Sequence, residues 1–205
     1  MFLPERRGHG RTPDVDGPLT YEGMAADTAA FIEALGIGPA HLVGWSDGAS
    51  VALYVALQRP ELVQKVICMG APAWFDGLTP KAQVDAQNLS LEHLPPSMIQ
   101  AHRDLSPDGP DHLPIFFDKI AALWAAEPHM TAEDLSRITA PTLVMLGDDD
   151  VLTVEHAATM AATLPDAQLA VVPGTDHGLL FEKPDLVNRL FLDFLADEQP
   201  PKLMS

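Results

Sequence analysis

Residues 40–57 constrain the fold more than any other stretch, because they join two apolar runs through a serine that stands between two glycines. The stretch reads AHLVGWSDGASVALYVAL, which predicts a strand, a sharp turn and a helix without a breaker. Ser46 lies in the turn, and Gly44 and Gly48 give it the G-x-S-x-G spacing of a nucleophile elbow. A Cβ at either glycine position is expected to crowd so tight a turn. The stretch therefore predicts that Ser46 projects from the end of a strand.

Apolar patterning over the rest of the chain alternates strands with helices. Further helices are expected over residues 21–35, 154–164 and 184–195, in addition to 50–58 after the elbow. Strands are expected over residues 42–43, 63–69, 142–146 and 169–172. The strands read as unbroken apolar runs, which is typical of a parallel sheet that is covered on both faces. The predicted class is therefore α/β, with a mostly parallel sheet and helices on both sides.

Residues 72–138 have a different character. Prolines at positions 72, 80, 95, 96, 107, 110, 114 and 128 separate short helical pieces, of which 97–103 and 115–126 are the clearest. This stretch is predicted to be a helical lid inserted into a core that is formed by residues 1–71 and 139–205. Its aromatic side chains, Trp74 and Trp124 among them, form either a small core of their own or the wall of an apolar pocket.

Composition excludes several classes of partner. With 12 basic and 29 acidic side chains, the formal net charge is -17, which disfavours nucleic acid and anionic membranes and leaves a small-molecule substrate. Cys68 is the only cysteine, so no intrachain disulfide or cysteine metal site can form, and it is expected to be a buried strand thiol. No histidine pair has metal-ligand spacing, so neither a metal nor a cofactor is expected. No apolar run approaches the ~20 residues that cross a bilayer, and no signal peptide is recognisable, so the expected location is cytoplasmic.

Three loops after predicted strands carry the groups that a serine nucleophile needs. They hold Ser46, then the acidic run at 148–150, then His177. A serine hydroxyl needs a base beside it, and the base needs an acid that fixes its tautomer. In an open parallel sheet, such groups come from loops at the carboxyl ends of the strands. Ser, Asp and His therefore follow one another in the order of one class of hydrolase.

Four segments together resemble the α/β-hydrolase fold family. ERRGHGRTPD at 5–14 resembles the family's D-x-R-G-x-G-x-S loop, and GWSDG at 44–48 resembles its elbow. LVMLGDDDVLT at 143–153 resembles its acid loop, and PGTDHGLLFEKPD at 173–185 resembles its histidine loop. Small esterases and amino-acid ester hydrolases of the valacyclovirase type share G-W-S-D-G, and actinobacterial hydrolases are also similar.

The resemblance implies a role for each matched residue. Ser46 is the nucleophile and His177 the general base and later acid. Asp150 is the orienting acid, at G-x-x-D spacing from Gly147, with Asp148 and Asp149 as alternatives. The Asp47 backbone N–H is one oxyanion donor, and its carboxylate can also hold the ammonium group of an α-amino ester. The side chains expected to contact substrate are Trp45, Asp47, Trp74 and Trp124.

The chain departs from the family at its beginning. The family has three more strands before the R-G-x-G loop, and an HG or HGGG-type loop that supplies a second oxyanion donor. We expect a start codon assigned downstream of the real one, or a truncated piece. The alternative is a natural short form whose N-terminal stub pairs in a homodimer. Without the third strand, the edge of the elbow strand is expected to be exposed or paired with another segment.

The expected function is that of a cofactor-free serine hydrolase acting on a small, fairly apolar ester, lactone or amide through an acyl-enzyme. Two alternatives on the same fold are cofactor-free haloperoxidase-like perhydrolysis and C–C bond hydrolysis. A third alternative is a non-catalytic binding or oligomerising form that keeps the triad without a complete oxyanion hole.

Overall fold

A four-stranded parallel sheet organises the computed structural model, which describes residues 1–196. The strands are β1 (Ala40–Trp45), β2 (Val63–Met69), β3 (Thr142–Gly147) and β4 (Ala167–Val172), and they lie in this order across the sheet. Every neighbouring pair is parallel. All four carboxyl ends therefore meet at one edge, as expected for the predicted α/β class, which is confirmed.

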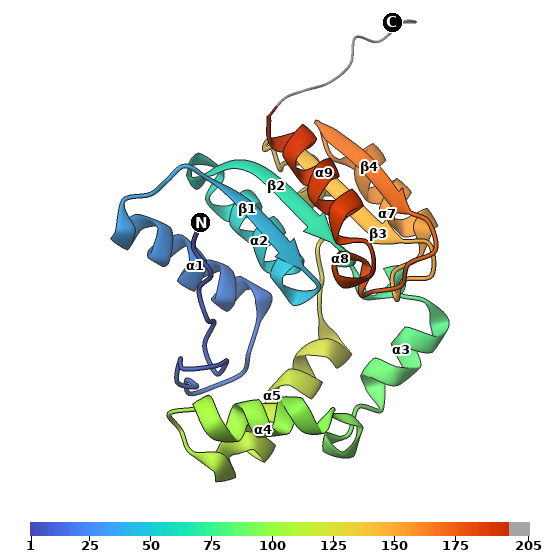
Figure 1. Ribbon diagram of the computed structural model, residues 1–205. Coiled ribbons are helices and arrows are strands. Elements are labelled where there is room, and N and C mark those ends of the chain that lie inside the picture. Colours follow the sequence, from blue (N-terminus) through green and yellow to red (C-terminus); the bar gives the residue numbers. More distant parts are fainter. Residues whose placement is uncertain (197–205) are drawn as a thin grey trace, which may run out of the picture.

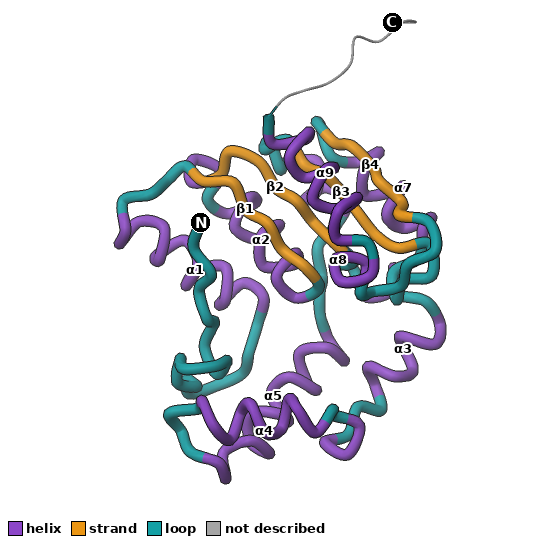
Figure 2. Tube along the Cα trace, viewed as in Figure 1, coloured by secondary structure: helices purple, strands orange, loops and turns teal. Residues whose placement is uncertain are grey.

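Helices cover both faces of this sheet (Figures 1 and 2). On one face, α2 (Asp47–Gln58) packs on β1 and β2, and α7 (Val154–Thr163) packs on β3 and β4. Outside them, α1 (Tyr21–Leu35) packs against α2. The short α8 (Leu179–Glu182) and α9 (Pro184–Leu195) cover the other face. None of the helices in residues 1–196 is long and apolar enough to cross a membrane.

The second half of strand β2, residues 66–69, is a continuous apolar run. Val66 and Cys68 belong to the apolar core on the α2 side, whereas Ile67 and Met69 belong to the core beneath α9. Successive strand side chains point to opposite faces, so this part of the strand, which is covered on both sides, is apolar at successive positions. Earlier in β2, Gln64 is exposed and the Lys65 ammonium donates to the backbone carbonyl of Phe194. Cys68 is buried as predicted, and its burial raises the pKa of the thiol to about 12, which keeps it protonated.

Strand β1 lies at one edge of the sheet, next to β2 alone among the described strands. Side chains on one face of this edge strand are also exposed: Val43 has 51% and Trp45 36% of its surface accessible. The exposed edge that the sequence predicts is therefore present in the described part of the chain.

Helices α3 (Pro80–Gln87), α4 (Pro96–Leu105) and α5 (Leu113–Ala126) lie together beyond the carboxyl ends of the strands (Figure 1). The following α6 (Ala132–Ser136) packs against α7 instead, and its Leu135 is fully buried in the main core. Short 3-10 helices occupy Pro60–Leu62, Phe75–Gly77, Leu91–His93 and Pro110–His112. We call residues 72–138 the helical segment; its role as a lid stays a prediction.

A nearly buried carboxylate ties the helical segment to the loop that precedes α1. Asp14 accepts hydrogen bonds from Lys119 Nζ at 2.7 Å and from His112 Nε2 at 2.9 Å, and its side chain is 5% exposed. Burial alone raises the pKa of Asp14, but the bonds from Lys119 and His112 outweigh it, so the pKa is lowered. This contact holds α5 against the loop that precedes α1.

Candidate active site

Ser46 occupies a strained turn between β1 and α2. Its φ of 55° and ψ of -127° make it the one described non-glycine residue with a positive φ. Its backbone N–H donates to the carbonyl of Met69 on the neighbouring strand at 2.8 Å, which holds the turn against the end of β2. Strained backbone of this kind persists only where the surroundings determine it. The turn has the form that the G-x-S-x-G spacing predicts.

The two glycines of the elbow serve different purposes. A Cβ on Gly44 would lie 2.2 Å from the backbone oxygen of Gly48 and 2.5 Å from the nitrogen of Ala49. A Cβ on Gly48 would meet nothing within 4 Å. The expectation that both positions are crowded is therefore wrong for Gly48, because its Cβ direction leads into open space. Only Gly44 is required by the close approach of helix α2 to strand β1.

His177 lies in the loop after β4 and contacts the acid in the loop after β3. Its Nδ1 donates to Asp150 Oδ1 at 2.8 Å, and the Asp150 side chain is fully buried. The same carboxylate accepts from the backbone N–H groups of Val151 at 2.7 Å and Gly147 at 3.3 Å. Because the carboxylate accepts the hydrogen bond from Nδ1–H, the neutral imidazole has its lone pair on Nε2, where a general base needs it.

The acidic run resolves into one buried and two exposed carboxylates. Asp148 and Asp149 are exposed, and Asp148 Oδ1 accepts from the backbone N–H of Thr175 at 3.1 Å. Only Asp150 contacts His177. Of the alternatives that the sequence leaves open, the structure places Asp150 in the orienting position.

Gly70 at the end of β2 is a site residue that sequence reasoning missed. Its φ is +60°, and an added Cβ would lie 2.9 Å from His177 Nδ1 and 3.3 Å from Asp150 Oδ2. A side chain here would push the histidine away from its acid. The available signal was the glycine that directly follows the apolar run of β2.

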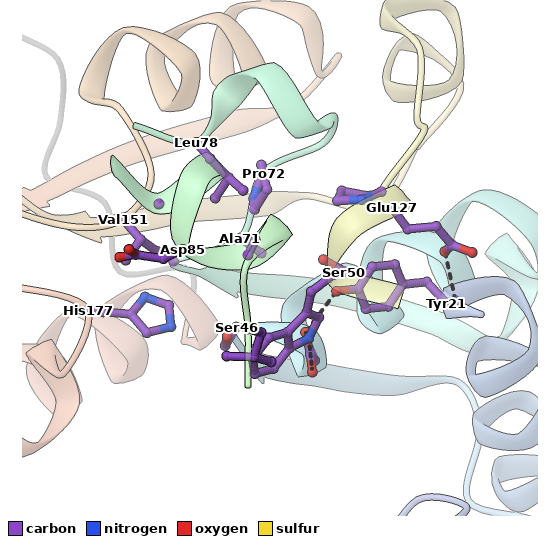
Figure 3. A pocket seen from close by; sticks show the side chains of 17 residues that line it. Tyr21, Ser46, Ser50, Ala71, Pro72, Leu78, Asp85, Glu127, Val151 and His177 are labelled. Carbon is purple, nitrogen blue, oxygen red and sulfur yellow. Dashed lines mark hydrogen bonds between the residues drawn. The ribbon is translucent and has the colours of Figure 1, made fainter. Parts of the chain in front are cut away.

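Ser46 and His177 line one cavity of ≈ 270 Å³, which lies between the strand ends and the helical segment (Figure 3). No hydrogen bond joins the Ser46 hydroxyl to the imidazole in the described structure. Catalytic hydrogen bonds are often long in a free enzyme and shorten only around a substrate. Three carboxylates, of Asp47, Asp85 and Glu127, also line this cavity, and none of its lining residues is a lysine or an arginine.

Asp47 carries two functional groups next to Ser46. Its backbone N–H stands at the start of α2, where the first turn of a helix leaves donors unpaired. Its carboxylate accepts from Tyr21 Oη at 2.8 Å and from Trp124 Nε1 at 3.0 and 3.1 Å. Burial is the main reason why the pKa of the Tyr21 hydroxyl is raised, and the charge of Asp47 is the second reason. The hydroxyl therefore stays protonated and donates to Asp47. Tyr21 was not among the residues singled out from the sequence.

The three tryptophans expected to contact substrate have different surroundings. Trp124 lines the cavity. Trp45 does not: its Nε1 donates to the backbone carbonyl of His177 at 2.8 Å, and its ring lies 5.2 Å from the imidazole. Trp74 does not line the cavity either, because its ring packs edge-on against His156 at 4.4 Å. His156 Nε2 also accepts from the backbone N–H of Ala73 at 3.1 Å.

No cluster of three or more metal-ligating side chains occurs within residues 1–196. The groups that line the cavity include the Ser46 hydroxyl, the His177 imidazole with its buried carboxylate partner, and the backbone N–H of Asp47 at a helix terminus. This set suits nucleophilic acyl transfer.

Comparison with known proteins assigns this architecture to a family. The profile of the Alpha/beta hydrolase family matches residues 2–190, which is most of the chain. The chain belongs to the alpha/beta hydrolase family. Its elbow, buried acid and histidine loop stand at the ends of β1, β3 and β4, in the chain order that this family uses.

Relatives of this alpha/beta hydrolase have several reactions in their names. A 2-hydroxy-6-oxo-6-phenylhexa-2,4-dienoate hydrolase of Burkholderia cepacia is 35% identical over 81% of the chain and 66% of its own length. A non-heme haloperoxidase of Rhodococcus erythropolis is 30% identical over 95% of the chain and 81% of its own. The solved structure of Est816, described as an N-acyl homoserine lactone degrading enzyme, superimposes with a TM-score of 0.71 and 27% identity, covering 92% and 80% of the two chains. The chain thus spans about two thirds to four fifths of the lengths of these proteins.

Proposed function

We propose that this protein is a serine hydrolase that cleaves a small, fairly apolar ester, lactone or amide through an acyl-enzyme. The observation that carries the proposal is the strained Ser46, in one cavity with an imidazole whose Nδ1 donates to the buried carboxylate of Asp150. Strain at a single non-glycine residue is typical of a functional site.

The proposed reaction assigns one step to each group. Ser46 Oγ attacks the carbonyl carbon while His177 Nε2 takes the hydroxyl proton, and the Asp150 carboxylate stabilises the resulting imidazolium. The oxyanion accepts a hydrogen bond from the Asp47 N–H, aided by the positive end of helix α2. His177 then protonates the leaving group, which departs. Water repeats the sequence on the acyl-enzyme, losing a proton to Nε2 and releasing the acid.

The charges that line the cavity disfavour an anionic substrate. Asp47, Asp85 and Glu127 repel carboxylates, and no lysine or arginine lines the wall to offset them. The Burkholderia relative is named for a dienoate, which carries a carboxylate. We therefore favour an ester, lactone or amide over C–C bond hydrolysis of an anionic dienoate. Perhydrolysis differs only in the use of hydrogen peroxide in place of water, and it remains the second candidate because of the haloperoxidase relative.

The test is a panel of p-nitrophenyl esters, from acetate to octanoate, on the protein and on Ser46→Ala. We expect the substitution to lower kcat by about 10³-fold or more. Repeating the panel with added peroxide measures perhydrolysis. A folded protein that hydrolyses no ester, and whose Ser46 is not labelled by a fluorophosphonate, would contradict the proposal and favour the non-catalytic alternative. Equal rates for both proteins would exclude Ser46 as the nucleophile.

A further inference from the structure

A second cavity of ≈ 290 Å³ lies beside the catalytic one. Asp47, Leu89 and Trp124 line both cavities, so these three residues form a shared wall. Beyond the wall, the second cavity is enclosed by the Gly8–Gly10 loop and by apolar side chains of α4 and α5. The second cavity is thus an apolar space directly adjacent to the one that contains Ser46.

Two imidazoles line this second cavity. His9 Nδ1 donates to the backbone carbonyl of Arg7 at 2.9 Å, which fixes the tautomer and leaves Nε2 as an acceptor. His9 Nε2 forms no hydrogen bond with any residue of the described chain. His102 Nε2 is buried and likewise has no partner there. Buried polar atoms are nearly always hydrogen-bonded, so the buried His102 Nε2, in the same cavity as the unpaired His9 Nε2, indicates a missing polar group.

Both imidazoles are held against the same ring. Phe116 receives the His9 ring edge-on at 5.1 Å and 87°, and the His102 ring nearly parallel at 5.8 Å and 16°. A Cβ on Gly8 would lie 2.1 Å from Phe116, so only glycine allows the loop to approach this closely. The polar atoms are therefore positioned by packing before any ligand arrives.

The charge state of the second cavity selects a neutral ligand. Burial lowers the pKa of His9 and of His102, so both imidazoles are uncharged at neutral pH. The wall contains the Asp47 carboxylate and, among its lining residues, no lysine or arginine. The Asp47 carboxylate in the lining repels an anion, and the Arg6 charge, which is near His9, lies outside the lining. A hydroxyl or N–H can donate to His9 Nε2.

We propose that the second cavity is a subsite for the distal end of the substrate, and that it selects an apolar chain or ring bearing a neutral hydrogen-bond donor such as a hydroxyl. The inference rests on the proposed hydrolase function, because it places the reacting bond at Ser46 and the donor beyond the shared wall. The specificity of the subsite comes from leaving His9 Nε2 unpaired when the donor is absent.

The experiment compares 4-butylphenol with butylbenzene, which differ by one hydroxyl, as ligands of the Ser46→Ala protein by calorimetry and by NMR. We expect the phenol to bind about fivefold more tightly, as one hydrogen bond to a buried acceptor predicts. His9→Phe keeps an aromatic ring against Phe116 but removes the acceptor, so it should abolish this preference and leave butylbenzene affinity unchanged. His41→Phe, at an exposed position outside both cavities, is the matched control and should keep the preference.

Each outcome decides the proposal. Equal affinities of the two ligands for the Ser46→Ala protein, or a preference that survives in His9→Phe, would overturn it. Ala101→Trp, which fills the second cavity from α4, should weaken both ligands about tenfold; unchanged binding would place them elsewhere. If His9→Phe does not fold, the His9 ring resonances of the Ser46→Ala protein provide the same test, since only the phenol should shift Nε2. Hydrolysis of p-nitrophenyl acetate by the wild-type protein, whose acyl group is too short to need the second cavity, tests the proposed function separately.

Discussion

Replacing Ser46 by glycine is expected to stabilise the protein while it abolishes hydrolysis. Ser46 has φ 55° and ψ -127°. Backbone in such a region costs a non-glycine residue about 1–3 kcal/mol, and glycine adopts it without that cost. The serine hydroxyl makes no capping bond to α2, so its removal sacrifices no helix cap. Glycine loses about 0.5–1 kcal/mol more backbone entropy on folding than alanine, which leaves a net gain of about 1 kcal/mol.

The matched control is Ser46→Ala, which removes the same hydroxyl but keeps the strained backbone. Both variants should lose ester hydrolysis equally. Urea denaturation should show Ser46→Gly to be the more stable of the two by about 1 kcal/mol, and its melting temperature should be higher by about 2–4 °C. If Ser46→Gly were no more stable than Ser46→Ala, the positive φ would not be a source of strain, and the elbow would owe its conformation to serine itself.

Three further predictions concern packing, pH and selectivity. Gly44→Ala should lower the free energy of unfolding by about 3 kcal/mol or more, because its Cβ would lie 2.2 Å from a backbone atom. Gly48→Ala, whose Cβ faces open space, should change this free energy by about 1 kcal/mol or less. Equal urea midpoints of the two variants would contradict the geometry. Burial lowers the pKa of His156 from 6.5 to about 4, so the folded state takes up this proton less readily than the unfolded chain. The free energy of unfolding should therefore fall by up to about 3 kcal/mol as pH falls from about 6.5 to 4. His156→Gln, which keeps an acceptor for the backbone N–H of Ala73, should reduce this loss of stability. If the variant has the same pH profile, the loss belongs to other groups. Asp47→Asn should lower kcat/KM for an α-amino ester about tenfold more than for the matching simple ester, and equal losses would show that the carboxylate does not hold the ammonium group.

The fold was predictable because burial on both faces leaves a simple record in the sequence. Apolar runs such as residues 66–69 of β2 occur where both sides of a strand are covered, and the glycines and prolines between strands and helices mark the turns. The strand limits were less accurate: β1 covers Ala40–Trp45, not only residues 42–43, because pairing with β2 extends the strand beyond the two most apolar residues.

The part of the candidate site that follows from the order of the strands was predictable. Parallel strands end at one edge, so the loops that hold Ser46, Asp150 and His177 had to lie near one another. Contacts between side chains that are far apart in the chain have no comparable signal in the sequence. Trp74 has the same local sequence whether it faces a cavity or His156, and nothing near Gly48 shows that its Cβ direction is open.

The contacts of Asp47 limit how freely parts of this protein can be exchanged. Asp47 offers the backbone N–H proposed to bind the oxyanion and a carboxylate that accepts hydrogen bonds from Tyr21 of α1 and Trp124 of α5. A chimera that receives its helical segment from another hydrolase would leave Asp47 without one of its two donors unless the graft also brings a tryptophan at this position. Recombination within this scaffold therefore has to carry α1, the elbow and α5 as a single unit, although they are separated along the gene.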